Sequence, residues 1–153
     1  MRMMSKKRGV APYRICEVDG NDDVVADALS ELHHLTFLDA APVPGFDQGH
    51  WWVASHRTGL VAFAGIVPST HVLNAGYFCR VGVVGEHCGH GLQLRLMRAM
   101  AARARLNGWG SIISDTTDNI HSANNFIRAG YRLFSPKTPW PWPNTLYWRK
   151  DLK

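Results

Sequence analysis

The sequence predicts an α/β or α+β fold, in which helices cover the faces of a β-sheet. Three observations support this prediction. Segments of alternating apolar and polar residues, typical of strands, are interspersed with segments whose apolar residues recur at helical spacing. Some successive strands are separated only by a tight turn, whereas others are separated by a helix. The 153 residues, 46% of them hydrophobic, suit a single domain, residues 1–153, with its own core.

The first strand and the first helix are expected at residues 13–18 and 24–35. The strand alternates (YRICEV), and the polar run DGNDD that follows it supplies turn and N-cap residues for the helix. Two prolines and a glycine within residues 42–45 then interrupt regular structure. Strands at residues 50–57 and 60–68 are joined by a tight turn, which predicts an antiparallel hairpin.

A strand at residues 75–84 leads through the glycine-rich segment GEHCGHG into a helix that begins at Leu92. One face of this helix is apolar, and its arginines lie mostly on other faces. Asn107 and Gly108 are typical of a helix end.

The last part of the chain is expected to alternate strands with one more helix. These elements are a strand at residues 111–117, a helix at 118–129, and strands at 131–134 and 145–152. Asp118 or Asn119 caps the helix and Gly130 closes it.

The glycine-rich segment has the composition of an anion site. A strand that ends in glycines and opens a helix leaves several backbone N–H groups unpaired, at the positive end of the helix dipole. Gly89 and Gly91 would let the main chain approach a phosphate closely. Turns also require glycine for steric reasons, so the spacing alone leaves both interpretations open.

The segments VVGEHCGHGLQLRLM, residues 83–97, and NIHSANNFIRAGY, residues 119–131, each carry a motif, and in their context these two motifs resemble those of the GNAT superfamily of acyl-CoA-dependent N-acyltransferases. The first is a strand ending in Val, a short link with Glu, and Arg/Gln-x-x-Gly-x-Gly/Ala opening a helix. The segment VVGEHCGHGLQLRLM matches it at Val83, Glu86, Cys88, Gly91 and Gln93. Cys88 and Gln93 depart from the residue types that the family has at their positions.

The second motif is an Asn, a small residue three positions later, a Tyr four beyond that, and Gly-Phe. The segment NIHSANNFIRAGY supplies Asn119, Ser122, Phe126, Gly130 and Tyr131 at these spacings. The chain therefore has Phe where the family often has Tyr, and Tyr where the family has Phe.

The resemblance implies a GNAT-like fold with a mixed, mostly antiparallel central sheet of six to seven strands. About four helices would cover its faces, and strands 4 and 5 would be splayed apart. The gap would receive the pantetheine arm of acetyl-CoA, the co-substrate, while the pyrophosphate would lie on the amides of the glycine-rich segment. The cofactor-binding residues implied by the resemblance are Val83, Val84, Cys88, Gly89, His90, Gly91, Leu92, Gln93, Asn119, Ser122 and Phe126.

The resemblance also locates candidates for proton transfer. Family members often use a Tyr at the position of Phe126 as general acid toward the departing thiolate, and that hydroxyl is missing here. In one branch a glutamate on the fourth strand is the base, and Tyr77 occupies the corresponding place, which makes Tyr77 the candidate catalytic residue. A tyrosine, with a pKa of about 10, is a poor base at neutral pH. Water relayed to Asp115 or to a histidine is the alternative.

The composition and the spacing of residue types indicate which cofactors, partners and cellular location to expect. The net charge of +5 and pI near 9.4 favour an anionic ligand or partner. Three cysteines and eight histidines show no spacing typical of a metal site or a disulfide framework, so no metal is expected and a cytoplasmic protein with reduced thiols is favoured. No apolar run is long enough for a membrane span, so no membrane association is expected. Residues 1–12 are expected to be flexible.

The predicted function is an N-acetyltransferase that transfers an acetyl group from acetyl-CoA to a primary amine, by direct attack in a ternary complex. The acceptor stays open between a small molecule, a peptide and an aminoacyl-tRNA. The alternatives are a non-catalytic acyl-CoA-binding or regulatory module and a tRNA-directed acetyltransferase of the toxin type. The resemblance adds a homodimer as a further expectation.

Overall fold

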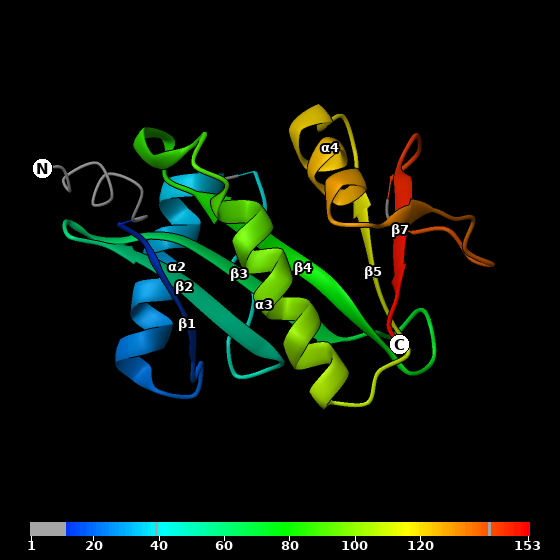
Figure 1. Ribbon diagram of the computed structural model, residues 1–153, viewed down its shortest axis with the longest axis horizontal. Helices are drawn as coiled ribbons and strands as arrows, with labels where there is room; N and C mark the ends of the chain where they lie inside the picture. The colour runs from blue at the N-terminus through cyan, green and yellow to red at the C-terminus, as the bar shows by residue number, and fades with distance from the viewer. Residues whose placement is uncertain (1–11, 39, 141) are drawn as a thin grey trace, which may run out of the picture.

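The computed structural model describes residues 12–38, 40–140 and 142–153. The strands form one seven-stranded sheet in the order β1-β2-β3-β4-β5-β7-β6 (Figure 1). They are β1 (Arg14–Val18), β2 (His50–His56), β3 (Gly59–Pro68), β4 (Ala75–Val83), β5 (Ser111–Thr116), β6 (Arg132–Leu133) and β7 (Leu146–Asp151). Neighbouring strands are antiparallel, except that β4 and β5 are parallel. The prediction of a mixed, mostly antiparallel sheet is confirmed.

Helices lie on both faces of the sheet. They are α2 (Asp23–Phe37), α3 (Leu92–Leu106), α4 (Ile120–Arg128) and a single 3-10 turn, η1 (Gly85–His87). The described residues thus hold three α-helices, fewer than the four or so expected. The helix α2 covers one face, and α3 and α4 cover the other (Figure 1). No described helix is long and apolar enough to span a bilayer. The sequence predicted that residues 1–12 are flexible, and residues 1–11 lie outside the described part of the chain.

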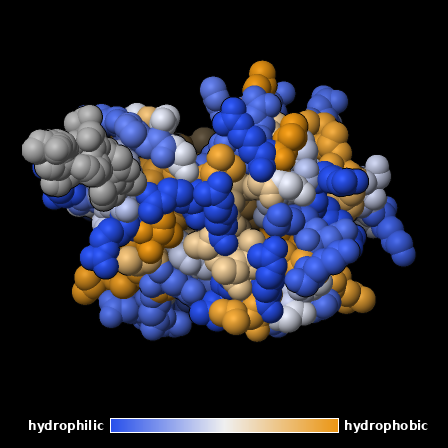
Figure 2. Space-filling model, viewed as in Figure 1, coloured by the Kyte–Doolittle hydropathy of each residue, from blue (hydrophilic) through white to orange (hydrophobic). Residues whose placement is uncertain are grey.

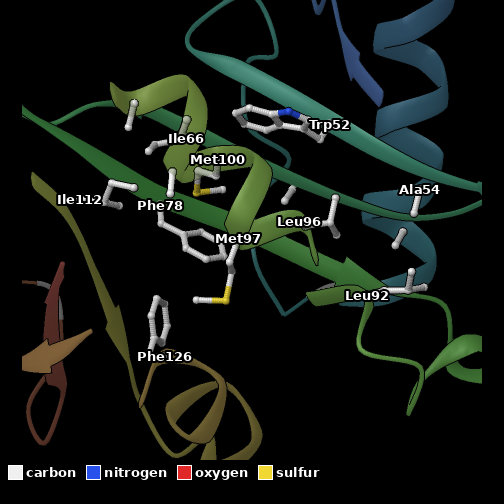
Figure 3. Packing of buried hydrophobic residues seen from close by; sticks show 14 of the residues in the cluster. Trp52, Ala54, Ile66, Phe78, Leu92, Leu96, Met97, Met100, Ile112 and Phe126 are labelled. Carbon is white, nitrogen blue, oxygen red and sulfur yellow. The ribbon is translucent and has the colours of Figure 1, made fainter. Parts of the chain in front are cut away.

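Apolar side chains fill the space on both sides of the sheet. Trp51 and Trp52 are adjacent in β2 and both buried, but Trp51 packs under α2 and Trp52 under α3, because successive side chains of a strand point to opposite faces. On the α3 side, Met97 and Met100 pack against Phe78 of β4 (Figure 3). Each fully buried side chain of this size contributes about 1.5–3 kcal/mol of hydrophobic stabilisation. This packing fixes α3 on the sheet.

A β-bulge in β4 lies just past the point where the sheet opens. Phe78 pairs with Ile66 of β3 but Arg80 pairs with Gly65, so Cys79 has no partner residue on β3. A bulge bends its strand. Pairing between β4 and β5 ends with Tyr77, after only three residue pairs, and the two strands then diverge (Figure 1). The predicted splay between strands 4 and 5 is confirmed, and the bulge at Cys79 follows the last β4 residue that pairs with β5, Tyr77, by two positions.

Candidate active site

A cleft of about 190 Å³ occupies the space between the diverging strands. It is lined by β4, by β5, by Phe37 of α2, by Asn119, the N-cap of α4, and by Ser122 and Phe126 within α4. At its closed end the buried Ser114 hydroxyl donates a 2.7 Å hydrogen bond to the carbonyl oxygen of Phe78. This side-chain bond satisfies a carbonyl that the ladder between the two strands no longer reaches.

A tyrosine and a carboxylate face each other in this cleft. The Tyr77 hydroxyl donates to Oδ2 of Asp115 at 2.6 Å, and the indole Nε1 of Trp140 donates to the same oxygen at 2.9 Å. Trp140 is stacked on His71, with ring centroids 4.0 Å apart. Burial, the hydrogen bond and the charge of Asp115 raise the pKa of Tyr77 well above its ordinary value. Tyr77 therefore keeps its proton at neutral pH and acts as a donor.

Phe126 contributes only apolar surface to the cleft. Its side chain is 3% exposed and packs against Phe78, with ring centroids 5.3 Å apart (Figure 3). It also contacts Tyr131 at 4.8 Å and lies nearly parallel to Trp148 at 5.7 Å. A phenylalanine suits this aromatic cluster, and the cleft gains no hydroxyl from this position.

An arginine lies at the edge of the cleft. The Arg80 guanidinium donates to the carbonyl oxygens of Cys79 and Pro42, at 2.8 and 2.9 Å, and to Nε2 of His33 at 3.2 Å. His33 is fully buried. Burial, and secondly the charge of Arg80, lower the pKa of His33, which keeps its ring neutral and able to accept this bond. Burial also raises the pKa of the Cys79 thiol to about 11.

The glycine-rich segment between β4 and α3, residues 84–91, is called the hinge from here on. Gly89 and Gly91 have φ values of 84° and 73°, a region in which glycine avoids the strain of a side chain. Gly91 is the N-cap of α3 and provides no side-chain cap. Within the described residues the backbone N–H groups of residues 89–94 donate no hydrogen bond, and Arg95 makes the first bond of the helix, to Gly91. Six free donors thus lie at the positive end of a helix, which favours an anion.

A cavity of about 550 Å³ separates the hinge from α4. Its lining includes the predicted residues Val83, Cys88, Gly89, Gly91, Leu92 and Gln93. The predicted residues Val84 and His90 are not part of the lining. The Leu92 side chain is buried in the core, so this residue offers its backbone to the cavity, while the buried Nε2 of Gln93 has no hydrogen-bond partner among the described residues.

The opposite wall of this cavity was not predicted from the sequence. It consists of His121, Asn124, Asn125 and Arg128 of α4. These residues follow one another at spacings of three, one and three, which places them on one face of a helix. A polar stripe at helical spacing beside the second motif is the signal that could have identified them.

Histidines gather on the outer side of the hinge. Nδ1 of His87 and the Tyr13 hydroxyl form a 2.9 Å hydrogen bond. The ring centroids of His56 and His90 lie within 5.5 Å of the centroid of the Tyr13 ring. Partial desolvation, followed by the neighbouring His87, lowers the pKa of His56. Among the described residues, no group of three or more His, Cys, Asp or Glu side chains is arranged to hold a metal ion.

A family model and several solved structures are similar to this chain. The family model described as "Acetyltransferase (GNAT) family" matches residues 22–131. The fold is similar to that of an acetyltransferase from Bacillus subtilis in complex with CoA, with 14% identity, a TM-score of 0.69, and coverage of 92% of this chain and 99% of that chain. No curated protein sequence matches the chain.

Two further solved structures share the fold and are named for their acceptors. Aminoglycoside 6'-acetyltransferase type Ii is 19% identical, with a TM-score of 0.71 and coverage of 90% of this chain and 96% of that chain. The ribosomal-protein-S18-alanine N-acetyltransferase from Escherichia coli is 10% identical, with a TM-score of 0.67 and coverage of 92% and 94%. At such identities these similarities establish the fold alone.

Proposed function

The chain belongs to the GNAT acetyltransferase family, and on that basis we propose that it transfers an acetyl group from acetyl-CoA to a primary amine by direct attack in a ternary complex. The observation that carries this proposal is the set of free N–H groups at residues 89–94, next to a cleft between two strands. A diphosphate is an anion that such a helix terminus favours. Past Tyr77, β4 has no strand partner on the side of this cleft, so main-chain groups of β4 there could bind an amide-bearing arm.

Specific residues would hold the cofactor. Residues 88–93 would bind the diphosphate mainly through backbone amides, which makes the side chains of Cys88 and Gln93 compatible with this role. Val83 and Val84 would offer main-chain groups to the pantetheine arm, and Asn119 and Ser122 would line its far side. When bound, the cofactor supplies an acetyl thioester.

A side chain of this protein would then accept the proton that the amine loses. Asp115 is the proposed base, accepting this proton directly or through one water. Tyr77 and Trp140 both donate to Oδ2, and Oδ1 accepts no hydrogen bond from the described residues. We therefore assign Tyr77 to the orientation of Asp115, because a phenol that keeps its proton cannot itself take one.

Proton donation to the departing thiolate is the weak part of the site. Phe126 offers no hydroxyl, so water is the proposed donor. Much of the rate in such a reaction comes from holding amine and thioester together. A slow enzyme, rather than an inactive one, is the expected consequence.

The acceptor is an amine whose class remains a prediction: a small molecule, a peptide or an aminoacyl-tRNA. The solved relatives named above are acetyltransferases of an aminoglycoside and of a ribosomal protein's alanine. A cytoplasmic location and a homodimer likewise remain predictions.

Calorimetric titration of CoA and a thiol-release assay with a panel of amines test the proposal. Gly91→Asp, which brings a negative charge to the hinge, should weaken CoA binding more than tenfold. Gly108→Asp is the matched control, because Gly108 also has positive φ and open space around it but lies at the other end of α3. Equal CoA affinity in both variants would refute the cofactor site.

The same assays separate the alternatives. Binding of CoA without thiol release for any amine would identify a non-catalytic module. Turnover restricted to aminoacyl-tRNA would identify a tRNA-directed acetyltransferase.

A further inference from the structure

Another cavity lies on the face that α3 and α4 cover, farther along α3 than the hinge. It has a volume of about 290 Å³ and is bounded by α3, by the end of α4 and by β7. Its lining carries four cations, Arg98, Arg105, Arg128 and Lys150; the cavity with these residues is called the basic groove. Figure 2 shows this face of the molecule, where strongly hydrophilic side chains lie beside apolar ones.

The positive charge of the basic groove is not compensated. Among the described residues, no carboxylate lines it, and none of its four cations belongs to an ion pair. Lys150 donates to the carbonyl oxygen of Ala129 at 2.8 Å, which is a neutral partner. Four like charges around one cavity repel one another, and an anion bound among them would remove this repulsion.

A buried hydroxyl provides the second, independent observation. Tyr131 lines the basic groove and is 4% exposed, yet its hydroxyl has no hydrogen-bond partner among the described residues. A buried hydroxyl without a partner is destabilising, and a phenylalanine would avoid the cost. Burial also raises the pKa of Tyr131, so the hydroxyl retains its proton and can donate to a bound oxygen.

The basic groove extends beyond the reach of the hinge. An α-helix rises about 1.5 Å per residue, so Arg105 lies about 20 Å along α3 from Gly91. Leu94 and Arg128 line both this groove and the hinge cavity, whereas Arg98, Arg105 and Lys150 line the groove alone.

We propose that the basic groove binds the phosphate group of a small organic phosphate, with the Tyr131 hydroxyl donating to a phosphate oxygen. Arginine guanidinium groups match phosphate oxygens with two parallel hydrogen bonds, and a doubly charged group suits several converging cations. Met97 and Ala101 add apolar surface to the groove for the organic part of the ligand. This inference does not depend on acetyl transfer.

Phenyl phosphate is a suitable probe, titrated calorimetrically into the full chain at low ionic strength with and without saturating CoA. Binding should persist with CoA, and phenol should not bind. Tyr131→Phe should weaken phenyl phosphate at least fivefold, and Arg105→Gln about tenfold. Arg132→Gln is the matched charge control, because Arg132 is exposed and does not line the groove; its affinity should equal that of the wild type.

Thermal denaturation shows whether each variant is folded. The melting temperature of Tyr131→Phe should be no lower than that of the wild type, because the substitution removes an unpaired buried hydroxyl. Phenyl phosphate should raise the melting temperature of this variant less than that of the wild type. Loss of probe binding with CoA would mean that the cofactor site binds the probe, and would overturn the proposal. Unchanged affinity in both Tyr131→Phe and Arg105→Gln would overturn it as well. The proposal would also be overturned if the protein bound RNA, if Arg105→Gln weakened that binding, and if phenyl phosphate did not bind.

Discussion

The Tyr77 hydroxyl and the Asp115 carboxylate meet at 2.6 Å across the opening between β4 and β5. Tyr77 is the last β4 residue that pairs with β5, so the contact lies where the sheet divides. The backbone therefore holds this pair rigidly on one side and leaves it open to the cleft on the other.

Asp115→Asn should lower kcat for acetyl transfer by about 10²–10⁴-fold, because a positioned base contributes a factor of that size. Affinity for CoA should not change. The assay is thiol release with the best amine of the panel, and the control is Asp118→Asn, which makes the same change outside the cleft at an exposed residue. Similar rates for the two variants would exclude Asp115 as the base.

Phe126→Tyr should raise kcat at least tenfold, since it adds a hydroxyl at the position where the family often has its acid. Phe126 lines the cleft, and the KM for acetyl-CoA should stay the same. An unchanged kcat in steady-state kinetics would show that another group protonates the departing thiolate.

Alkaline pH should destabilise the protein through its buried tyrosines. The pKa values of Tyr77 and Tyr131 are raised above 10, by burial in both and by Asp115 in the first. A raised pKa in the folded state gives stability that is fully present below the ordinary value and is lost as pH rises above it. The free energy of unfolding should fall by about 1.4 kcal/mol per pH unit for each such tyrosine above pH 10 or so.

Tyr131→Phe isolates one of these contributions. Urea denaturation of this variant at a series of pH values above 10 should show a shallower loss of stability than the wild type. Parallel pH profiles would contradict the assignment.

Ser114→Ala should lower the free energy of unfolding by about 1–3 kcal/mol, because it leaves the buried carbonyl of Phe78 without its 2.7 Å bond. Ser111→Ala is the control: Ser111 is buried in the same strand and makes no side-chain hydrogen bond to another described residue. Chemical denaturation measures both, and equal losses would mean that the bond itself contributes little.

Gly91→Ala should cost about 1 kcal/mol, because alanine is strained at positive φ. Gly85→Ala should change stability by less than about 0.5 kcal/mol. Both glycines have open space where a Cβ would lie, and only Gly91 has positive φ, so the pair isolates backbone strain. Thermal denaturation that shows equal effects would contradict this explanation.

Local patterns predicted much of the fold. The alternation in each strand, and the capping residues of α4, identified most of the elements within a few residues, because both depend on neighbours in the sequence. The hinge was predicted for the same reason: Gly89 and Gly91 lie immediately before α3, and both adopt positive φ.

Non-local features were not accessible in this way. The bulge at Cys79 is a property of the register between β3 and β4, and no single segment encodes it. The contacts of Asp115 with Tyr77 and Trp140 join residues 38 and 25 positions apart. The basic groove likewise combines arginines of α3 with Arg128 and Lys150, which meet only after the sheet has formed.

The early end of pairing between β4 and β5 leaves β4 with a sheet edge that faces the cleft. Such an edge is a template for any extended molecule that carries amide groups at a suitable spacing. An amide-bearing cofactor arm would act there as a substitute strand, whereas a protein without it would expose the edge to the strands of other molecules. Purification and storage with CoA should therefore suppress aggregation.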